Sequence, residues 1–155
     1  MIKPGIHGAP CMKNFKMLPD AEITVEVNPG TVDEQYVAQL LAIGVNRISL
    51  GVQTFNDREL HSLGRIHDSS TARAAFQATK RAGCKNINLD LMYGIPGQNA
   101  ESWRSTLGQA ISLGPQHLSL YQLTIEEGTP FYLAYEAGEF TLPNENEILL
   151  MDDIT

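Results

Sequence analysis

The segment Asn86-Ile-Asn-Leu-Asp-Leu-Met92 alternates polar and apolar side chains, and the turn residues Gly94-Ile-Pro-Gly97 follow it. A strand built from this segment has an apolar face made of Ile87, Leu89 and Leu91, and a polar face made of Asn86, Asn88 and Asp90. Parallel strands that are covered on both faces are usually apolar throughout. The alternation therefore predicts helices on one side of this strand and a polar crevice on the other.

The same alternation recurs along the chain, in strand-like segments separated by helix-like ones. We predict strands at Glu22–Val27, Arg47–Val52, Asn86–Met92 and His117–Leu123. We predict helices from Thr31 to Ile43, near Asp57–Leu63, through Ala82 with Ser69 or Ser70 as the N-cap, and at Asn99–Leu113, Phe131–Ala137 and Asn144–Asp153. The first helix begins with a capping box, in which Thr31 is the N-cap and Glu34 returns the bond. Strands that alternate with helices predict a parallel sheet with right-handed crossovers.

The predicted fold class is α/β, as a partial (β/α) barrel of the TIM type with about four βα units. A complete barrel takes roughly 250 residues, so a chain of 155 residues is either a small open sheet or a slice of a larger barrel. We assign residues 1–19 to a truncated or atypical N-terminal segment, and residues 20–155 to the partial core.

Hydropathy, net charge and cysteine spacing argue against several classes of protein. The chain is 43% hydrophobic, has a mean hydropathy of −0.16, and contains neither a membrane-span-length apolar run nor a signal-peptide core, which predicts a cytoplasmic protein. Its net charge of −7 argues against a broad nucleic-acid surface, because binding phosphates needs clustered Lys and Arg. The cysteines Cys11 and Cys84 form no CxxC pattern, and His61 and His67 lie six residues apart, so we predict no metal site made wholly within this chain.

Polar residues gather where the predicted strands end. Glu26, Gln53, Asp90 and the stretch Tyr121–Thr124 each lie at or just beyond the carboxyl end of a strand. Parallel α/β proteins build their sites at this edge. The alternative is that these groups pair with one another or face solvent on an uncovered sheet.

Five linked segments resemble the radical SAM core of the heme chaperone and oxygen-independent coproporphyrinogen III oxidase family, in order and at family spacing. They are Glu22–Gly30, Gly44–Gln53, Leu63–His67, Asn88–Gly97 and His117–Glu126. The resemblance covers about Leu18 to Asn144. The Asn-Pro-Gly that ends at Gly30 and the Leu-Gly-Arg-Ile-His that ends at His67 look more like the heme-chaperone branch than the oxidase branch.

The resemblance implies a set of residues that bind S-adenosylmethionine: Glu26, Gln53, Arg65, Asp90 and Thr124. It implies that Glu26 and Gln53 contact this cofactor, that Arg65 holds its carboxylate, and that Asp90 accepts hydrogen bonds. Thr124 matches a backbone position beside the adenine. A guanidinium grips a carboxylate through two parallel bonds, which suits the role of Arg65; the alternative for Arg65 is a solvated loop cation.

Other parts of the family pattern are missing from this sequence. It has no CxxxCxxC motif to hold the 4Fe-4S cluster of the intact family. The Gly-rich segment of the family is also absent, and Gly5–Pro10 resembles it only weakly. The sequence contains no C-terminal domain for heme or substrate. Cys11 cannot replace three thiolates. The chain is thus predicted to be a fragment that carries part of the S-adenosylmethionine site but performs no radical chemistry alone, with heme or porphyrin as the partner of the intact protein.

Two further hypotheses compete with this one. In the first, the chain is a non-catalytic half-barrel that binds nucleoside-like ligands, forms a homodimer, or docks to the missing half-barrel through its open sheet edges. In the second, it is an unrelated aldolase or phosphate enzyme. That reading needs a strand-end Lys or a Gly-rich phosphate loop, whereas no predicted strand ends in Lys and the loop Gly94–Gly97 contains a Pro.

Overall fold

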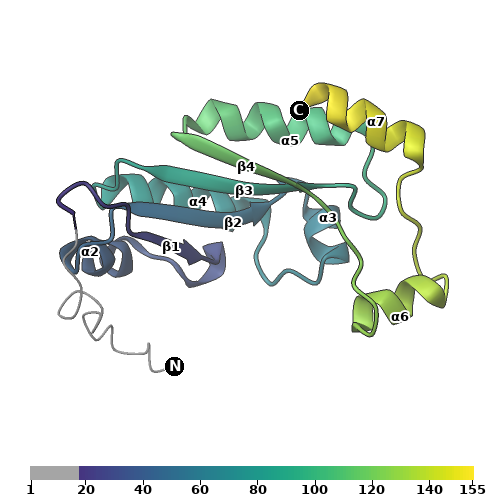
Figure 1. Ribbon diagram of the computed structural model, residues 1–155, viewed down its shortest axis with the longest axis horizontal. Coiled ribbons are helices and arrows are strands. Elements are labelled where there is room, and N and C mark those ends of the chain that lie inside the picture. Colours follow the sequence, from purple (N-terminus) through teal and green to yellow (C-terminus); the bar gives the residue numbers. More distant parts are fainter. Residues whose placement is uncertain (1–17) are drawn as a thin grey trace.

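Four parallel strands form one sheet in the computed structural model, which describes residues 18–155 (Figure 1). The strands are β1 (Thr24–Val27), β2 (Arg47–Gln53), β3 (Ile87–Tyr93) and β4 (His117–Gln122). They lie in the order β1-β2-β3-β4, so each strand pairs with its neighbour in sequence. The predicted strands all occur, with ends that differ by two residues or fewer.

Helices connect and follow the strands. They are the 3-10 turn η1 (Pro29–Thr31) and the α-helices α2 (Glu34–Ala42), α3 (Asp57–Ser62), α4 (Ser69–Arg81), α5 (Ala100–Leu113), α6 (Pro130–Glu136) and α7 (Glu145–Ile154). This alternation of parallel strands with helices confirms the predicted α/β class. Of the predicted segment 1–19, only residues 18 and 19 are among the described residues, and Cys11 lies outside them.

Two of the predicted N-caps were wrong. Pro29 begins a 3-10 turn, in which the Thr31 hydroxyl donates to the Asn28 carbonyl at 2.8 Å; the cap of α2 is instead Asp33, which accepts from the Tyr36 amide. Helix α4 is capped by Asp68 rather than by either serine. Hydrogen bonds from the Thr71 hydroxyl, the Thr71 amide and the Ser70 hydroxyl lower the pKa of Asp68 to about 2.

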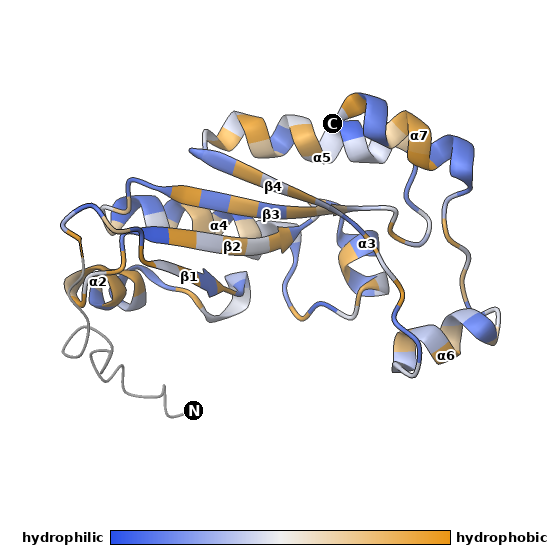
Figure 2. Ribbon diagram, in the orientation of Figure 1, coloured by the Kyte–Doolittle hydropathy of each residue, from blue (hydrophilic) through white to orange (hydrophobic). Residues whose placement is uncertain are grey.

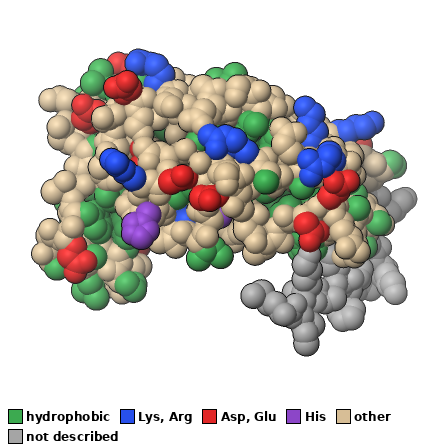
Figure 3. Space-filling view, turned by 180° about the vertical axis from the view of Figure 1, so that it is seen from behind, with side chains coloured by type: hydrophobic (Ala, Val, Ile, Leu, Met, Phe, Trp, Pro, Cys, Tyr) green, Lys and Arg blue, Asp and Glu red, His purple; other side chains and the backbone are tan. Residues whose placement is uncertain are grey.

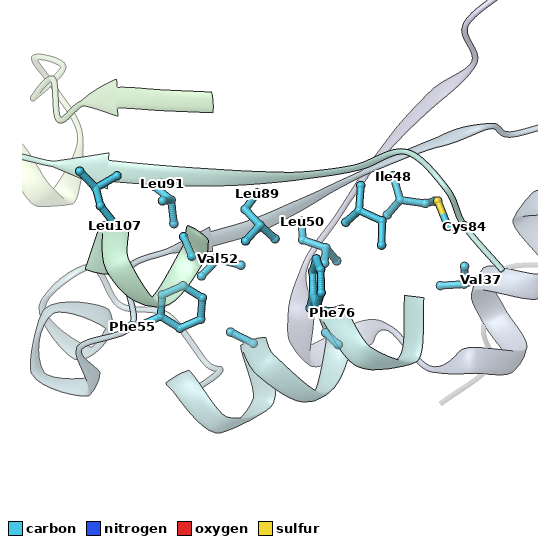
Figure 4. Close-up of a cluster of buried hydrophobic side chains, with 14 of the residues drawn as sticks. Val37, Ile48, Leu50, Val52, Phe55, Phe76, Cys84, Leu89, Leu91 and Leu107 are labelled. Atoms are coloured by element: carbon cyan, nitrogen blue, oxygen red, sulfur yellow. The ribbon is translucent and has the colours of Figure 1, made fainter. Parts of the chain in front are cut away.

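The hydrophobic core lies between the helices and the apolar face of the sheet. Figure 2 shows the alternation along the strands and the apolar stripes of the helices. The fully buried core side chains from the strands are Ile48, Leu50, Val52, Ile87, Leu89 and Leu91. Phe76 of α4 points toward Leu50, and Phe55 lies beside Val52 (Figure 4). Burying a side chain of this size contributes about 1.5–3 kcal/mol, so this layer fixes the register of the strands and hence the positions of their polar ends.

The last helix is tied to the end of β3 by aromatic side chains. The rings of Tyr93 and Trp103 lie 5.4 Å apart, and the Tyr93 hydroxyl donates to Asp152 of α7 at 2.6 Å. The Trp103 indole donates to Thr155 at 3.2 Å. Helix α7 thereby covers part of α5 (Figure 1).

This tie predicts a pH dependence of stability at alkaline pH. The hydrogen bond to Asp152, burial and the negative charge of Asp152 together raise the pKa of Tyr93 from 10.0 to about 12. Because the folded pKa is the higher one, the stabilisation is fully present below pH 10 and is lost as the pH rises through 12. We expect the unfolding free energy to fall more steeply in this window for the wild type than for Tyr93→Phe, as measured by urea titrations. Parallel slopes for the two proteins would contradict this.

The surface has no single dominant charge on the face that Figure 3 shows, where acidic and basic side chains are interspersed. Hydrophobic side chains gather at the end of the molecule formed by α6, which carries the exposed Leu133 and Tyr135. Within residues 18–155, no helix combines the length and the apolarity that a membrane span requires.

Candidate S-adenosylmethionine site

The carboxyl ends of β1 and β2, the middle of β3 and the loop after α3 line a cavity of about 340 Å³. Its lining residues are Glu26, Val27, Asn28, Gly51, Gln53, Arg65 and Asp90. The polar face of the sheet provides most of them. The cavity therefore lies at the edge where parallel sheets usually carry their sites.

A bulge shapes the β2 wall of this cavity. Between Leu50 and Gln53 the chain of β2 has one residue more than β3, because Leu50 pairs with Leu89 but Gln53 pairs with Leu91. At this bulge Gln53 has a φ of 68°, the only positive φ of a non-glycine residue within 18–155. Such a conformation costs about 1–3 kcal/mol and occurs mainly at functional sites.

Gly51 keeps the space beside Gln53 open. A Cβ atom at position 51 would lie 3.2 Å from the Gln53 amide nitrogen and 3.8 Å from the Asn28 side-chain oxygen. A larger residue there would displace the Gln53 side chain or fill the cavity. Glycine thus leaves room for a ligand between β1 and β2.

Arg65 reaches the cavity from a loop with two anchors. Its amide donates to the Leu60 carbonyl at 2.9 Å, and two residues later the buried His67 places Nε2 3.4 Å from the Val52 carbonyl. The Arg65 side chain is exposed and forms no ion pair with any of the residues 18–155, and the same holds for Glu26. The cavity is therefore lined by one cation, Arg65, and one anion, Glu26, that form no ion pair within the described residues.

Asp90 lies deeper, and both its carboxylate oxygens are hydrogen-bonded. Oδ1 accepts from the Asn88 amide at 2.7 Å, and Oδ2 accepts from the Ser49 hydroxyl at 2.8 Å. Asn88 and Ser49 are both buried on the polar face of the sheet, where alternation within β2 and β3 placed them. Their contact with Asp90 was not predicted, although their position on the polar face was the signal that could have revealed it.

The structure brings together four of the five residues predicted to bind the cofactor. Glu26, Gln53, Arg65 and Asp90 come from four separate segments and line one cavity. Thr124 lies two residues beyond the end of β4, is exposed, and is not among the lining residues. The ligand of these residues stays a prediction at this point.

A second polar cluster lies behind the bulge, and no sequence signal identified it. Glu59 of α3 is only 3% exposed, although its place in a short polar helix is typical of a surface residue. Its carboxylate accepts from Thr54 at 2.5 Å, from Gln98 at 3.0 Å, and from Ser102. This cluster joins the end of β2, the loop after β3 and the start of α5 behind the cavity wall.

The sequence profile of the Radical SAM superfamily matches residues 10–110 of this chain. The chain belongs to the radical SAM superfamily. This agrees with the predicted resemblance, and with a parallel sheet whose polar face carries a cavity at the strand ends.

Both branches of the family are represented among the similar proteins. The heme chaperone HemW of Escherichia coli is 50% identical over 112 residues, which cover 72% of this chain and 30% of the relative. The heme chaperone HemW of Haemophilus influenzae is 49% identical over 110 residues, covering 71% of this chain and 29% of the relative. The crystallised radical SAM enzyme coproporphyrinogen III oxidase (HemN) of E. coli matches with a TM-score of 0.77 and 30% identity, over 91% of this chain and 32% of that chain. The chain therefore spans about a third of the length of these relatives and carries part of a radical SAM core.

The residues of this chain do not fit an iron–sulfur cluster. Three thiolates are needed to hold three irons of a site-differentiated cluster, and the sequence contains two cysteines. Cys84 is buried just before β3, at the end of the sheet opposite to the cavity. No group of three or more His, Cys, Asp or Glu side chains within residues 18–155 is arranged to hold a metal ion.

Proposed function

We propose that this chain supplies the part of a radical SAM core that binds the amino-acid and ribose portions of S-adenosylmethionine. One observation carries the proposal: four side chains from separate segments, each matching a cofactor contact of the family, converge on one cavity. A cavity with one guanidinium, two carboxylates and two side-chain amides suits a ligand that carries a carboxylate, an ammonium group and hydroxyls.

Each side chain has a chemical role in this proposal. The Arg65 guanidinium holds the ligand carboxylate through charge-assisted bonds. Glu26, which is exposed and outside any described ion pair, accepts from the ammonium group. Gln53 can both donate and accept through its amide, and Asp90 accepts from ribose hydroxyls. When bound, S-adenosylmethionine supplies a cleavable sulfonium, and the residues of this chain bind and orient it.

The named relatives extend the proposal to the whole protein. Both HemW proteins are named as heme chaperones, and HemN as a coproporphyrinogen III oxidase. We therefore propose a role in heme or porphyrin metabolism, in the cytoplasm, with heme or a porphyrin bound by parts of the protein other than the cavity. Thr124 is included as a backbone contact to the adenine. Pairing of open sheet edges in a homodimer stays a prediction, which gel filtration would test.

The experiment is isothermal titration of the purified chain with S-adenosylmethionine. We expect saturable binding with one site, and a loss of affinity of about tenfold in Glu26→Ala, which removes one charge-assisted bond of about 1.5 kcal/mol or more. Glu136→Ala is the matched control, because Glu136 is exposed on α6, remote from the cavity. No saturation at millimolar ligand, or equal affinity in wild type and Glu26→Ala, would overturn the proposal.

A further inference from the structure

The Asn88 side chain is the most completely bonded polar group on the open face of the sheet. It is 1% exposed. Its Nδ2 donates to Ser49 Oγ at 2.6 Å and to Asp90 Oδ1 at 2.7 Å. Its Oδ1 accepts from Ser119 Oγ at 3.1 Å and lies 2.5 Å from His117 Nδ1. An amide has two donor hydrogens and two acceptor lone pairs, so every bonding position of Asn88 is used.

These partners allow only one orientation of the amide. The Ser49 hydroxyl gives its single hydrogen to Asp90 Oδ2, so toward Asn88 it can only accept. Rotating the amide by 180° would place its oxygen against two acceptors, Ser49 and the Asp90 carboxylate. The opposite side requires His117 to carry its proton on Nδ1, facing the Asn88 oxygen. The Asn88 amide is therefore fixed from the side of Ser49 and Asp90, and His117 and Ser119 complete its bonding on the side of β4.

This lock fixes the carboxylate of Asp90. One of its oxygens is held by Asn88 and the other by Ser49, both from the buried side, so the carboxylate plane cannot rotate without breaking a bond. Lone pairs not used by these bonds remain for a ligand in the cavity that Asp90 lines. Groups that orient a binding residue in this way usually contribute strongly to affinity without touching the ligand.

We propose that Asn88 is a positioning residue, which fixes Asp90 for its bond to the ligand, with Ser49 as its partner. This rests on the proposed function, since it takes Asp90 to be a ligand contact. The network links three strands, from His117 and Ser119 on β4 through Asn88 on β3 to Ser49 on β2. The binding of a ligand by Asp90 thereby depends on the pairing of β4 with β3.

The test compares two substitutions at position 88 by titration with S-adenosylmethionine. Asn88→Ala removes the donor to Asp90 and is expected to lower affinity roughly tenfold, the lower end of losses for groups that orient a binding residue. Asn88→Asp keeps the shape but replaces the donor by a second carboxylate, so a similar or larger loss is expected at about pH 8. A proton on the new carboxyl restores a donor to Asp90. The affinity of this variant relative to wild type is therefore expected to recover as the pH falls to about 5.

The pH comparison is made as a ratio to the wild type at each pH, because other charged and titratable groups surround position 88. His117 and Asp90 face position 88 directly, while Glu22, Arg47 and Lys85 line the opening beside His117. A loss caused by general disorder would not be rescued by acid. Recovery of the ratio is thus the readout that separates positioning from a structural role.

Two controls accompany the variants. Ser119→Ala removes a partner of Asn88 but leaves both donors to Asp90, so its affinity is expected to change less than threefold. Thr79→Val alters an equally buried hydroxyl, which bonds only to the Ala75 carbonyl within α4, and should bind as the wild type does.

If Asn88→Ala fails to fold, Asn88→Asp and the exchange rate of the Asn88 side-chain amide protons still test the lock. These protons are expected to exchange slower than those of the exposed Asn146, and equal rates would overturn the proposal.

The outcomes separate this inference from the proposed function. If Asp90→Asn weakens binding while both Asn88 variants bind as the wild type does, the positioning role is wrong and the site stands. If the wild type itself fails to bind, the proposed function falls, and this inference falls with it.

Discussion

Replacing Glu59 by Ala is expected to lower the free energy of unfolding by about 3 kcal/mol, because buried donors lose their acceptor. The Glu59 carboxylate is buried and forms no ion pair within residues 18–155, so donors alone hold it: the Thr54 hydroxyl, the Gln98 amide and the Ser102 hydroxyl. Alanine would remove the acceptor of these three donors, at a cost of about 1–3 kcal/mol for each donor that finds no other partner. Urea unfolding followed by circular dichroism measures the loss.

Two matched variants show whether the acceptor is what matters. Glu59→Gln keeps the shape and one acceptor oxygen, so we expect it to lose about half as much stability as Glu59→Ala. Glu101→Ala, at an exposed position at the start of α5, is expected to change stability by less than about 0.5 kcal/mol. A loss below about 1 kcal/mol in Glu59→Ala would mean that the donors find water or other partners.

The Glu59 cluster also connects stability to the cavity. Thr54, which donates to Glu59, directly follows Gln53 and its strained backbone, and it also shares a contact of 3.1 Å with Thr106 of α5. A strained conformation persists only where its surroundings hold it. Partial unfolding of this cluster should therefore release the Gln53 side chain from the cavity wall.

The fold was predictable because its signals are local. Alternation along β3 distinguished Leu89 from Asp90, and turn residues such as Gly94 marked the strand ends. The helix caps were less predictable, because several residues near each start can act as a cap. The Thr31 hydroxyl is already used by a local turn, and only the backbone path determines that Asp33 takes its place.

The candidate site was predictable in part, for a different reason. Glu26 and Asp90 could be assigned to one edge because parallel strands all end there, and Arg65 was assigned through the resemblance. The bulge at Gln53 and the burial of Glu59 were not predictable, since both depend on packing between elements far apart in sequence. Asn88 lay on the predicted polar face, but its bond to His117 depends on the register of β3 against β4.

Replacing Arg65 by Ala is expected to weaken S-adenosylmethionine binding by roughly 10- to 150-fold, which corresponds to about 1.5–3 kcal/mol for a charge-assisted bond. The side chain is exposed and lies outside any described ion pair, so its removal costs the fold little and the loss falls on the ligand. Arg65→Lys keeps the charge but not the planar fork, and should recover only part of the affinity. Titration calorimetry of the three proteins measures both effects.

Arg58→Ala is the control for this prediction. Arg58 is an exposed cation on α3, seven residues before Arg65, and does not line the cavity. Loss of a distant charge alone would affect both variants similarly and would be screened by salt. If the Arg65 guanidinium bonds directly to the carboxylate of S-adenosylmethionine, only Arg65→Ala binds this ligand weakly, and its thermal stability is unchanged. Such a bond also predicts that the loss disappears for a ligand without the carboxylate, such as 5′-methylthioadenosine. If that ligand loses as much affinity in Arg65→Ala as S-adenosylmethionine does, Arg65 is not the group that holds the carboxylate.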